Sequence, residues 1–287
     1  MSSAHRPHVI ALLSDFGGSD WYVAEMKGVL LTHAPGVPLV DITHEIPPGD
    51  VPRAAFVLAR AHGAFPPNTV YLVVVDPGVG TARLPLAVRA GNAFYVGPDN
   101  GVLEAALDLA GAEARVIEDL ELLERTSGTF HGRDVFAPVA ARIALRGESA
   151  WRELGRPLDV PVRLPPLLGA DHAHAEGLAH AAETGALRTS VAHVDRFGNA
   201  ITALHELELE AWLGTHDPSR VRFVAHGARR TTIVGLARTY GAARPDEPIA
   251  LVGSSGLLEL AIPGGHAGLH LGLAPGDVVE LLHGEES

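Results

Sequence analysis

The sequence lacks cysteine, and it also lacks a long hydrophobic run. Without cysteine, disulfides, thiolate nucleophiles and cysteine-based zinc sites are excluded. No stretch approaches the roughly 18 apolar residues that a membrane span requires, and the apolar run at residues 9–13 is too short for the core of a signal peptide. We therefore expect a soluble, cytoplasmic protein that has no membrane partner.

Basic residues are scarce as well. The chain has 22 Lys and Arg against 34 Asp and Glu, a formal net charge of -12, which argues against nucleic acid as a partner. The hydrophobic fraction of 47% predicts a globular protein with a sizeable core. Phosphate-loop and dinucleotide-binding glycine patterns are absent, and so is the G-x-S-x-G motif. The acidic balance is compatible with a cationic small molecule.

The first half of the chain alternates between predicted strands and helices, which indicates an α/β fold with a mostly parallel central sheet. The predicted strands are at residues 8–14, 37–43 and 69–75, followed by a hairpin over residues 85–97. The predicted helices are at residues 19–36, 49–67, 101–111 and 135–147.

The pattern changes beyond Trp151. Prolines and glycines without periodicity predict a linker at residues 167–186, and its histidines, His172, His174 and His180, favour a solvated segment over a metal site. Short strands separated by turns then indicate a small β-barrel. We therefore predict an N-terminal α/β domain over residues 1–166 and a C-terminal β-barrel domain over residues 187–287.

Two predicted strands end in an aspartate that is soon followed by glycine. Asp15 stands in "LLSDFGG" and Asp76 in "VVVDPGVG". Ligands of an open parallel sheet bind at the carboxyl ends of its strands, where glycine allows a ligand to approach the backbone. The competing interpretation is that both aspartates only cap turns.

The stretch "GTFHGRDVFAP" places a histidine at the start of a predicted helix. His131 is a candidate base or anion-site residue there; the alternative is that Asp134 caps the helix and His131 is an ordinary loop residue. The turn "YVGPDNGVL", with Asp99 and Asn100, favours a purely structural interpretation.

Eight motifs together resemble one family, the S-adenosyl-L-methionine hydroxide adenosyltransferases, which are related to the fluorinase and the chlorinase. They occur in order from residue 14 to about residue 277, so the resemblance covers nearly the whole chain. The motifs are "SDFGGSDWYVAEMKG", "VDITHEIPPGDV", "VVVDPGVGT", "GPDNGVL", "TFHGRDVFAPVAA", "VDRFGNAIT", "GSSGLLELAI" and "LGLAPGD".

The resemblance implies the fold described above, a homotrimer, and S-adenosyl-L-methionine bound between the N-terminal domain of one subunit and the C-terminal domain of its neighbour. It implies that water or hydroxide attacks ribose C5′, which gives adenosine and L-methionine. A sulfonium leaving group is already cationic and needs no general acid. The implied reaction therefore uses neither a cofactor nor a metal ion.

The family's catalytic network carries over to Asp76, Arg83 and His131. In this interpretation Asp76 and His131 hydrogen-bond the water and draw on its proton. Arg83 keeps the carboxylate ionised and offsets its repulsion of a hydroxide-like nucleophile.

The substrate-binding positions of the family carry over to both halves of the chain. Asp15 matches the acceptor of both ribose hydroxyls, and Asp20 matches a contact to the methionine ammonium. Asn199 matches an adenine contact, and Ser254 a contact to the amino-acid end. The remaining positions are Thr129, Phe130, Phe197 and Ala267. Of these, Ala267 matches a backbone contact to the edge of the adenine.

Three alternatives remain open at the level of the sequence. A halogenase of the same fold is disfavoured because halogenases carry Tyr-Pro and Thr where this chain has Asp76-Pro77 and Val79. A non-catalytic binder of an adenosyl ligand is a second possibility. A metal-dependent hydrolase built on Asp15, Asp20, Asp76 and His131 is a third. The chain also departs from the family pattern, with Ala203 in place of Asn and Ser255 where the halogenases have Arg.

Overall fold

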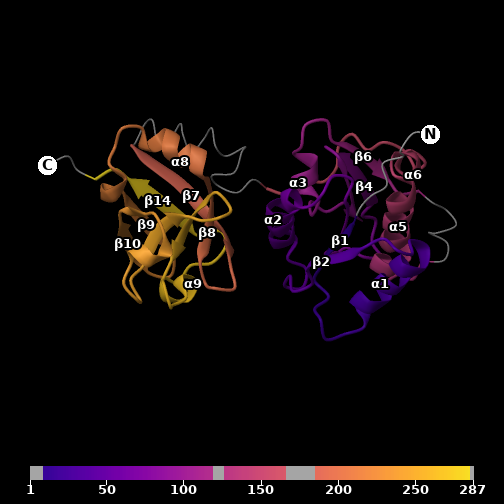
Figure 1. Ribbon diagram of the computed structural model, residues 1–287, viewed down its shortest axis with the longest axis horizontal. Helices are drawn as coiled ribbons and strands as arrows, with labels where there is room; N and C mark the ends of the chain where they lie inside the picture. Colours follow the sequence, from indigo (N-terminus) through magenta and orange to yellow (C-terminus); the bar gives the residue numbers. More distant parts are fainter. Residues whose placement is uncertain (1–8, 119–125, 166–184, 285–287) are drawn as a thin grey trace. The chain divides into compact units, whose positions relative to one another are not determined.

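The computed structural model describes residues 9–118, 126–165 and 185–284. The chain divides into two compact units, Met1–Leu164 and Pro165–Ser287, and each is described by itself (Figure 1). Most of the predicted linker, and all three of its histidines, lie outside the described residues. The domain boundaries given above therefore remain a prediction. In the described part of the chain, no helix is both long and apolar enough to cross a membrane.

The N-terminal unit contains a six-stranded sheet in the order β2-β1-β3-β5-β4-β6. The pairs β1–β2, β1–β3 and β3–β5 are parallel, whereas β4 is antiparallel to both of its neighbours. The predicted mostly parallel sheet and the predicted hairpin, formed by β4 and β5, are thus confirmed. The strands are β1 (Ile10–Ser14), β2 (Leu39–Thr43), β3 (Val70–Val74), β4 (Pro85–Ala90), β5 (Ala93–Pro98) and β6 (Glu113–Val116).

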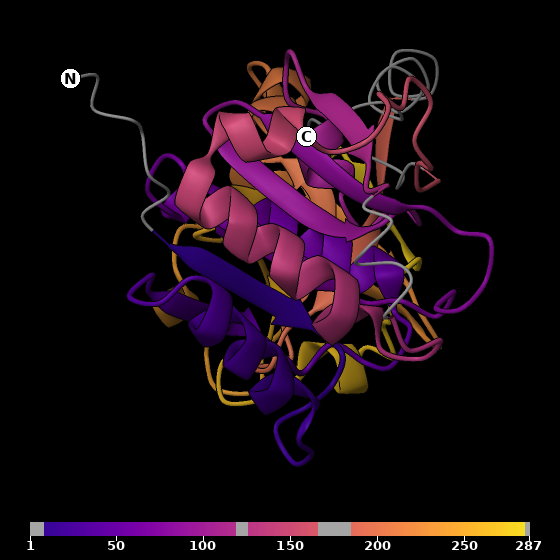
Figure 2. The same ribbon diagram turned by 90° about the vertical axis from the view of Figure 1, so that its right-hand side faces the viewer.

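Helices cover both faces of this sheet, which explains why β1 and β3 read as uninterrupted apolar runs. Ile10 and Leu12 of β1 pack in one core cluster with α1 (Tyr22–His33) and α5 (Ala137–Arg146). Ala11 and Leu13 point the other way, into a cluster with α2 (Val51–Ala61) and α3 (Glu104–Leu107). Figure 1 shows the two helix layers on opposite sides of the strands, and Figure 2 looks onto the layer that contains α1 and α5.

Two helices of this unit differ from the sequence prediction. The helix predicted over residues 101–111 is limited to α3. Gly101 and Gly111, at the two ends of the predicted range, have φ of 91° and 74°, which an α-helix cannot include. The helix predicted from residue 135 is preceded by η2 (Gly132–Phe136), a π-helical turn that leads directly into α5. The short helix α6 (Glu148–Arg152) follows α5.

The C-terminal unit contains an eight-stranded sheet in the order β10-β9-β14-β7-β8-β13-β12-β11. Its strands near opposite ends, β10 and β12, lie against each other, so the sheet curls into an almost closed barrel. The predicted small β-barrel is therefore confirmed. The strands are β7 (Ala186–Val194), β8 (Ala200–His205), β9 (Arg222–His226), β10 (Arg230–Val234), β11 (Leu236–Ala237), β12 (Ile249–Val252), β13 (Leu257–Ala261) and β14 (Val278–Leu282).

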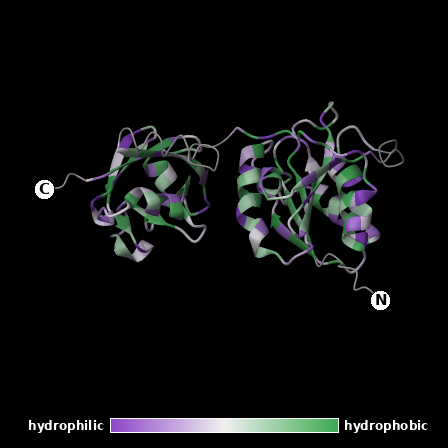
Figure 3. Cartoon of the chain, turned by 90° about the horizontal axis from the view of Figure 1, so that it is seen from above, coloured by the Kyte–Doolittle hydropathy of each residue, from purple (hydrophilic) through white to green (hydrophobic). Residues whose placement is uncertain are grey.

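Helix α8 (Glu206–Leu213) was not predicted from the sequence. Its capping box begins with His205, whose ring accepts a hydrogen bond from the backbone while Glu208 reaches back to the N-cap. Because histidine is not among the usual capping residues, this start signal is hard to see in the sequence. The short helix α9 (Ala267–His270) precedes β14. In Figure 3 the strands inside each unit are mostly coloured as hydrophobic, consistent with a separate core in each.

Candidate functional site

The carboxyl ends of β1 and β3 bring the two predicted aspartates to one edge of the N-terminal sheet. Ser14 pairs with Val74 in the parallel register, so Asp15 and Asp76 leave neighbouring strands at nearly the same level. Asp15 is half-buried and accepts a hydrogen bond from the backbone of Gly49 at 2.8 Å. Burial is the main cause that raises the pKa of Asp15, with a smaller contribution from the charge of Asp76.

Asp76 forms a nearly buried ion pair with Arg83. The Arg83 Nε lies 2.9 and 3.1 Å from the two carboxylate oxygens, and Nη2 lies 2.5 Å from Oδ2. The two side chains are 7% and 9% exposed, so little water screens the pair. Arg83 Nη1 is buried and has no hydrogen-bond partner in the described part of the chain. It is therefore a donor that a bound molecule could use.

Glycines make room for this arginine. A Cβ on Gly78 would lie 3.2 Å from Cγ of Arg83, and a Cβ on Gly80 would lie 2.6 Å from the carbonyl oxygen of Gly128. Gly80 also has a φ of 77°, which disfavours other residues. The segment "PGVG" thus folds back tightly enough to return Arg83 to the carboxylate that precedes it.

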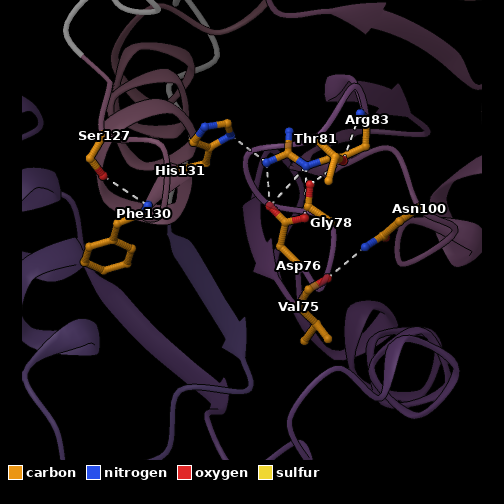
Figure 4. Close-up of polar contacts among 9 residues, drawn as sticks. All are labelled: Val75, Asp76, Gly78, Thr81, Arg83, Asn100, Ser127, Phe130 and His131. Atoms are coloured by element: carbon orange, nitrogen blue, oxygen red, sulfur yellow. Dashed lines mark hydrogen bonds and ion pairs between the residues drawn. The ribbon is translucent and has the colours of Figure 1, made fainter.

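His131 joins this pair through the same guanidinium. Its Nδ1 lies 2.6 Å from Nη2 of Arg83, and Figure 4 shows the arginine between the histidine and Asp76. Because a guanidinium can only donate, Nδ1 is the acceptor and the neutral ring carries its proton on Nε2. Burial, followed by the charge of Arg83, lowers the pKa of His131 below 6.5.

The π-helical turn fixes His131 in place. The preceding residue, Phe130, is buried, and the centroid of its ring lies 5.6 Å from that of Phe16 and 5.3 Å from that of Tyr22. This packing anchors the chain immediately before His131. Asp134 accepts a hydrogen bond from the backbone of Ser127 at 2.9 Å. Arg133 ties Asp134 to Glu25 on α1, at 2.5 and 2.9 Å respectively.

One residue of this region was missed by sequence reasoning. Asn100, which the sequence suggested only as part of a turn, donates from Nδ2 to the carbonyl oxygen of Val75 at 2.9 Å. Its Oδ1 accepts from the backbone of Val102 at 3.1 Å, so the turn holds the peptide just before Asp76 (Figure 4). The motif "GPDNGVL" is the available signal, but by itself it predicts only a turn.

The other predicted N-terminal residues lie at the surface. Asp20 and Thr129 are exposed. Trp21, which the sequence did not single out, is 61% exposed and lies against Tyr22. No group of three or more His, Cys, Asp or Glu side chains in the described ranges is arranged to hold a metal ion. The cationic Arg83 occupies the space between Asp76 and His131 and would repel a divalent cation.

In the C-terminal unit, the structure brings three predicted residues together around the turn between β7 and β8. Phe197 is 79% exposed, and Asn199 is partly exposed beside it. Gly198, between them, accepts a hydrogen bond from the backbone of Gly268, which places Ala267 next to this turn. A Cβ on Gly198 would lie 2.3 Å from the ring of His266, so only glycine fits.

A buried carboxylate connects Asn199 with the turn that contains Ser254. Glu259, in the middle of β13, is 4% exposed and accepts a hydrogen bond from the Tyr240 hydroxyl at 2.5 Å. That hydroxyl lies 3.5 Å from Nδ2 of Asn199. A Cβ on Gly253 would lie 2.2 Å from Glu259 Oε1. Burial is the main cause that raises the pKa of both Glu259 and Tyr240. Neither residue was singled out from the sequence.

The fold and these two groups of residues define a class: a protein with an α/β unit that presents an Asp–Arg–His cluster and a β-barrel unit that presents exposed aromatic and amide groups. Residues 10–154 match the SAM hydroxide adenosyltransferase N-terminal domain, and residues 189–280 match the C-terminal domain of the same family. The chain belongs to the SAM hydroxide adenosyltransferase family, where SAM is S-adenosyl-L-methionine.

Individual relatives agree with this assignment. A Salinispora arenicola protein named (R)-S-adenosyl-L-methionine hydrolase is 41% identical over 96% of this chain and 98% of its own length. A fluorinase from an Actinoplanes species is 26% identical over 88% of this chain and 90% of its own. The crystal structure of an uncharacterized conserved protein from Thermotoga maritima superposes with a TM-score of 0.84 at 34% identity, covering 96% of this chain and 100% of that one.

Proposed function

We propose that this protein hydrolyses S-adenosyl-L-methionine to adenosine and L-methionine. The observation that carries the proposal is the buried Asp76–Arg83–His131 cluster at the carboxyl edge of the sheet, in a chain 41% identical to a named (R)-S-adenosyl-L-methionine hydrolase. We extend the (R) configuration at sulfur from that name to the substrate of this protein.

In the proposed reaction, the oxygen of water forms a bond to ribose C5′ while the C5′–S bond breaks. The bonding electrons leave with sulfur, so the sulfonium becomes the neutral thioether of methionine, and the water loses one proton to solvent. Asp76 accepts a hydrogen bond from the water and turns an oxygen lone pair toward C5′. The partial exclusion of solvent around this pair leaves the water fewer competing partners.

His131 has a different part in this proposal from the one the sequence suggested. Its Nδ1 faces Arg83, so the ring can offer the water only its Nε2–H. We therefore assign His131 as a neutral donor that orients the water, rather than as the group that removes its proton. Arg83 holds both side chains at once.

The remaining predicted residues are proposed to bind the substrate. Asp15 takes the ribose hydroxyls, and Asp20, Thr129 and Phe130 complete the contacts of the N-terminal unit. Phe197, Asn199 and Ala267 take the adenine, and Ser254 takes the amino-acid end. The family resemblance supports a homotrimer in which neighbouring subunits share each substrate, and light scattering on the purified protein tests that state. A cytoplasmic location and the absence of a cofactor also remain predictions.

A halogenase of the same fold is less favourable on electrostatic grounds. A halide at the position of the water would lie close to the Asp76 carboxylate. Two like charges 4 Å apart repel by about 4 kcal/mol at an effective dielectric constant of 20, a repulsion that Arg83 offsets only in part. Water has no such penalty, and it gains a hydrogen-bond acceptor.

The test is to incubate the purified protein with each sulfur epimer of S-adenosyl-L-methionine and to identify the products by chromatography. We expect adenosine and methionine from the (R) epimer, without added metal and with chelator present. In labelled water, the label should appear on the 5′ oxygen of adenosine. Methylthioadenosine or S-adenosylhomocysteine as products, or a 5′-halo nucleoside in concentrated chloride or fluoride, would contradict the proposal.

A further inference from the structure

The turn between β7 and β8 is organised by the carboxylate of Asp195. Its Oδ1 accepts hydrogen bonds from the backbone nitrogens of Phe197 and Asn199, each at 2.9 Å. Its Oδ2 accepts from the side-chain Nδ2 of Asn199 at 3.1 Å. One carboxylate therefore fixes both the backbone of the turn and the side chain that the proposed function assigns to adenine.

This arrangement determines which way the Asn199 amide points. An ionised carboxylate can only accept hydrogen bonds, so the amide atom that faces Asp195 is the nitrogen. Tyr240 favours the same orientation of the amide. Its hydroxyl donates its hydrogen to Glu259, so the hydroxyl oxygen can only accept from Nδ2 of Asn199. The hydrogen bonds of the Asn199 side chain within the described residues all use Nδ2, so Oδ1 remains available as an acceptor.

The surface around this amide is accessible. Phe197, two residues before Asn199, is 79% exposed, and Tyr240, whose hydroxyl contacts the amide, is 44% exposed, so both aromatic residues are open to a ligand. A flat ring that stacks on an aromatic side chain there would have its edge near Oδ1 of Asn199. The Nδ2 contact to Tyr240 is long, at 3.5 Å, so this hydrogen can be shared with a second acceptor on the ligand.

We propose that Asp195 is a positioning residue that makes the site select a purine with an amino group at C6. Asparagine pairs with adenine by accepting from N6 and donating to N7. A 6-oxo purine presents two acceptors at that edge, one of which would face Oδ1 without a proton between them. The inference rests on the proposed function, since it takes Asn199 to contact the purine.

The sharpest test is Asp195→Asn, which reverses the polarity of one atom at nearly constant shape. The side-chain oxygen of the new residue still caps the two backbone N–H groups, but its NH₂ now faces Asn199. The Asn199 amide should then turn its oxygen inward and present Nδ2 to the ligand. We expect the preference for adenosine over inosine, measured as the ratio of their Kd values by calorimetry, to fall by about 10-fold or more, because adenosine loses both contacts whereas inosine exchanges the contact at N7 for one at O6.

Asp217→Asn is the matched control. Asp217 also accepts from a backbone nitrogen two residues on, that of Ser219, and it lies at an exposed turn of the same unit. The preference of the Asp217→Asn variant for adenosine over inosine should equal that of the wild type. Tyr240→Phe removes the weaker acceptor and should lower the preference by about 2- to 5-fold. If Asp195→Asn does not fold, as judged by circular dichroism, Asn199→Ala replaces it and should abolish the preference.

An unchanged preference in folded Asp195→Asn, or in Asn199→Ala, would overturn the inference. So would an equal weakening of both nucleosides in Asp195→Asn. Failure of the proposed function is detected separately, because it appears as wild-type protein that binds adenosine but releases none from S-adenosyl-L-methionine.

Discussion

The two groups of candidate residues differ in how their charges are arranged. In the N-terminal unit, Asp76, Arg83 and His131 form one connected cluster, and its acid–base pair is largely shielded from solvent. In the C-terminal unit, a buried acid and a half-exposed acid, Glu259 and Asp195, hold neutral groups, while aromatic rings lie at the surface. A cluster of the first kind can orient and polarise a small nucleophile. A group of the second kind can recognise a flat ligand by its edge and its face.

This difference gives an expectation for mutants. Changes in the N-terminal cluster should lower kcat, because they affect interactions that strengthen in the transition state. Changes in the C-terminal group should raise KM, because adenine lies far from the reacting bond and is held equally in both states.

The largest effect is expected for Asp76→Asn. The amide cannot match the charge of Arg83, and it orients the water less strongly, so kcat should fall on the order of 10³-fold. Removing one partner of a buried ion pair should also lower the stability by about 3–5 kcal/mol. Kinetics and thermal unfolding measure the two effects. Asp108→Asn, which breaks the exposed ion pair with Arg163, is the control and should change neither strongly. A kcat within a few fold of the wild type would remove Asp76 from the reaction.

The next effect is expected at His131. His131→Ala should lower kcat on the order of 10²-fold, whereas His131→Gln, whose amide can place an N–H near the position of Nε2, should recover part of this loss. A residue that takes the proton could not be replaced by an amide. Comparable losses in the two variants would therefore favour a base over a donor.

The same assignment predicts the pH profile of the wild type. The neutral ring is the active form, and its pKa lies below the ordinary value of 6.5. Because histidine ordinarily titrates at about 6.5 and the pKa of His131 lies lower, kcat should stay level as the pH falls from 8 toward about 6.5. It should decline only at lower pH, where the ring gains a proton. In His131→Gln that acidic decline should weaken or disappear.

Asp15→Asn is expected to be an exception to the rule that changes in the N-terminal unit lower kcat and changes in the C-terminal unit raise KM. Asp15 lies on the N-terminal sheet, but its proposed contacts are to ribose hydroxyls, so KM should rise by about 10- to 100-fold while kcat changes little. Initial-rate kinetics and calorimetric binding of adenosine would both show it. If kcat falls instead, Asp15 belongs with Asp76 as part of the nucleophile site.

The smallest of these effects is expected for Phe197→Ala. Loss of a stacking ring should raise KM by about 5- to 20-fold, in line with the 1–3 kcal/mol typical of base stacking on an aromatic side chain. Because Phe197 is exposed, the unfolding temperature should stay close to that of the wild type. Leu207→Ala, at another exposed apolar position of the same unit, is the control. Equal KM values in both variants would argue against adenine at this turn.

Much of the N-terminal site could be predicted because parallel strands obey a simple rule. A buried apolar run that ends in Asp76 predicts its position at the carboxyl edge, and the glycines after it predict a tight turn. Asn100 could not be assigned in this way. Its bond to the Val75 carbonyl joins residues 25 positions apart, and a turn motif looks the same with or without such a partner.

Tyr240 and Glu259 in the barrel could not be assigned from the sequence for the same reason. Glu259 lies in a strand whose other residues are apolar, and an isolated acid in a short strand gives no sign of being buried or paired. Its partner Tyr240 comes from a separate short turn. The helix α8 was missed for a related reason, since its capping histidine has no strong intrinsic preference for that position.

The sequence by itself determined the layers of the fold, the strands that carry Asp15 and Asp76, and the motifs that identify the family, because these follow from hydrophobic period and local turn chemistry. Only the tertiary structure decided which atoms face each other: that Arg83 lies between Asp76 and His131, that the proton of neutral His131 is on Nε2, and that the Asn199 amide presents its oxygen. Hydrogen-bond direction depends on the partner brought by the fold, and a linear pattern of residues does not contain that partner.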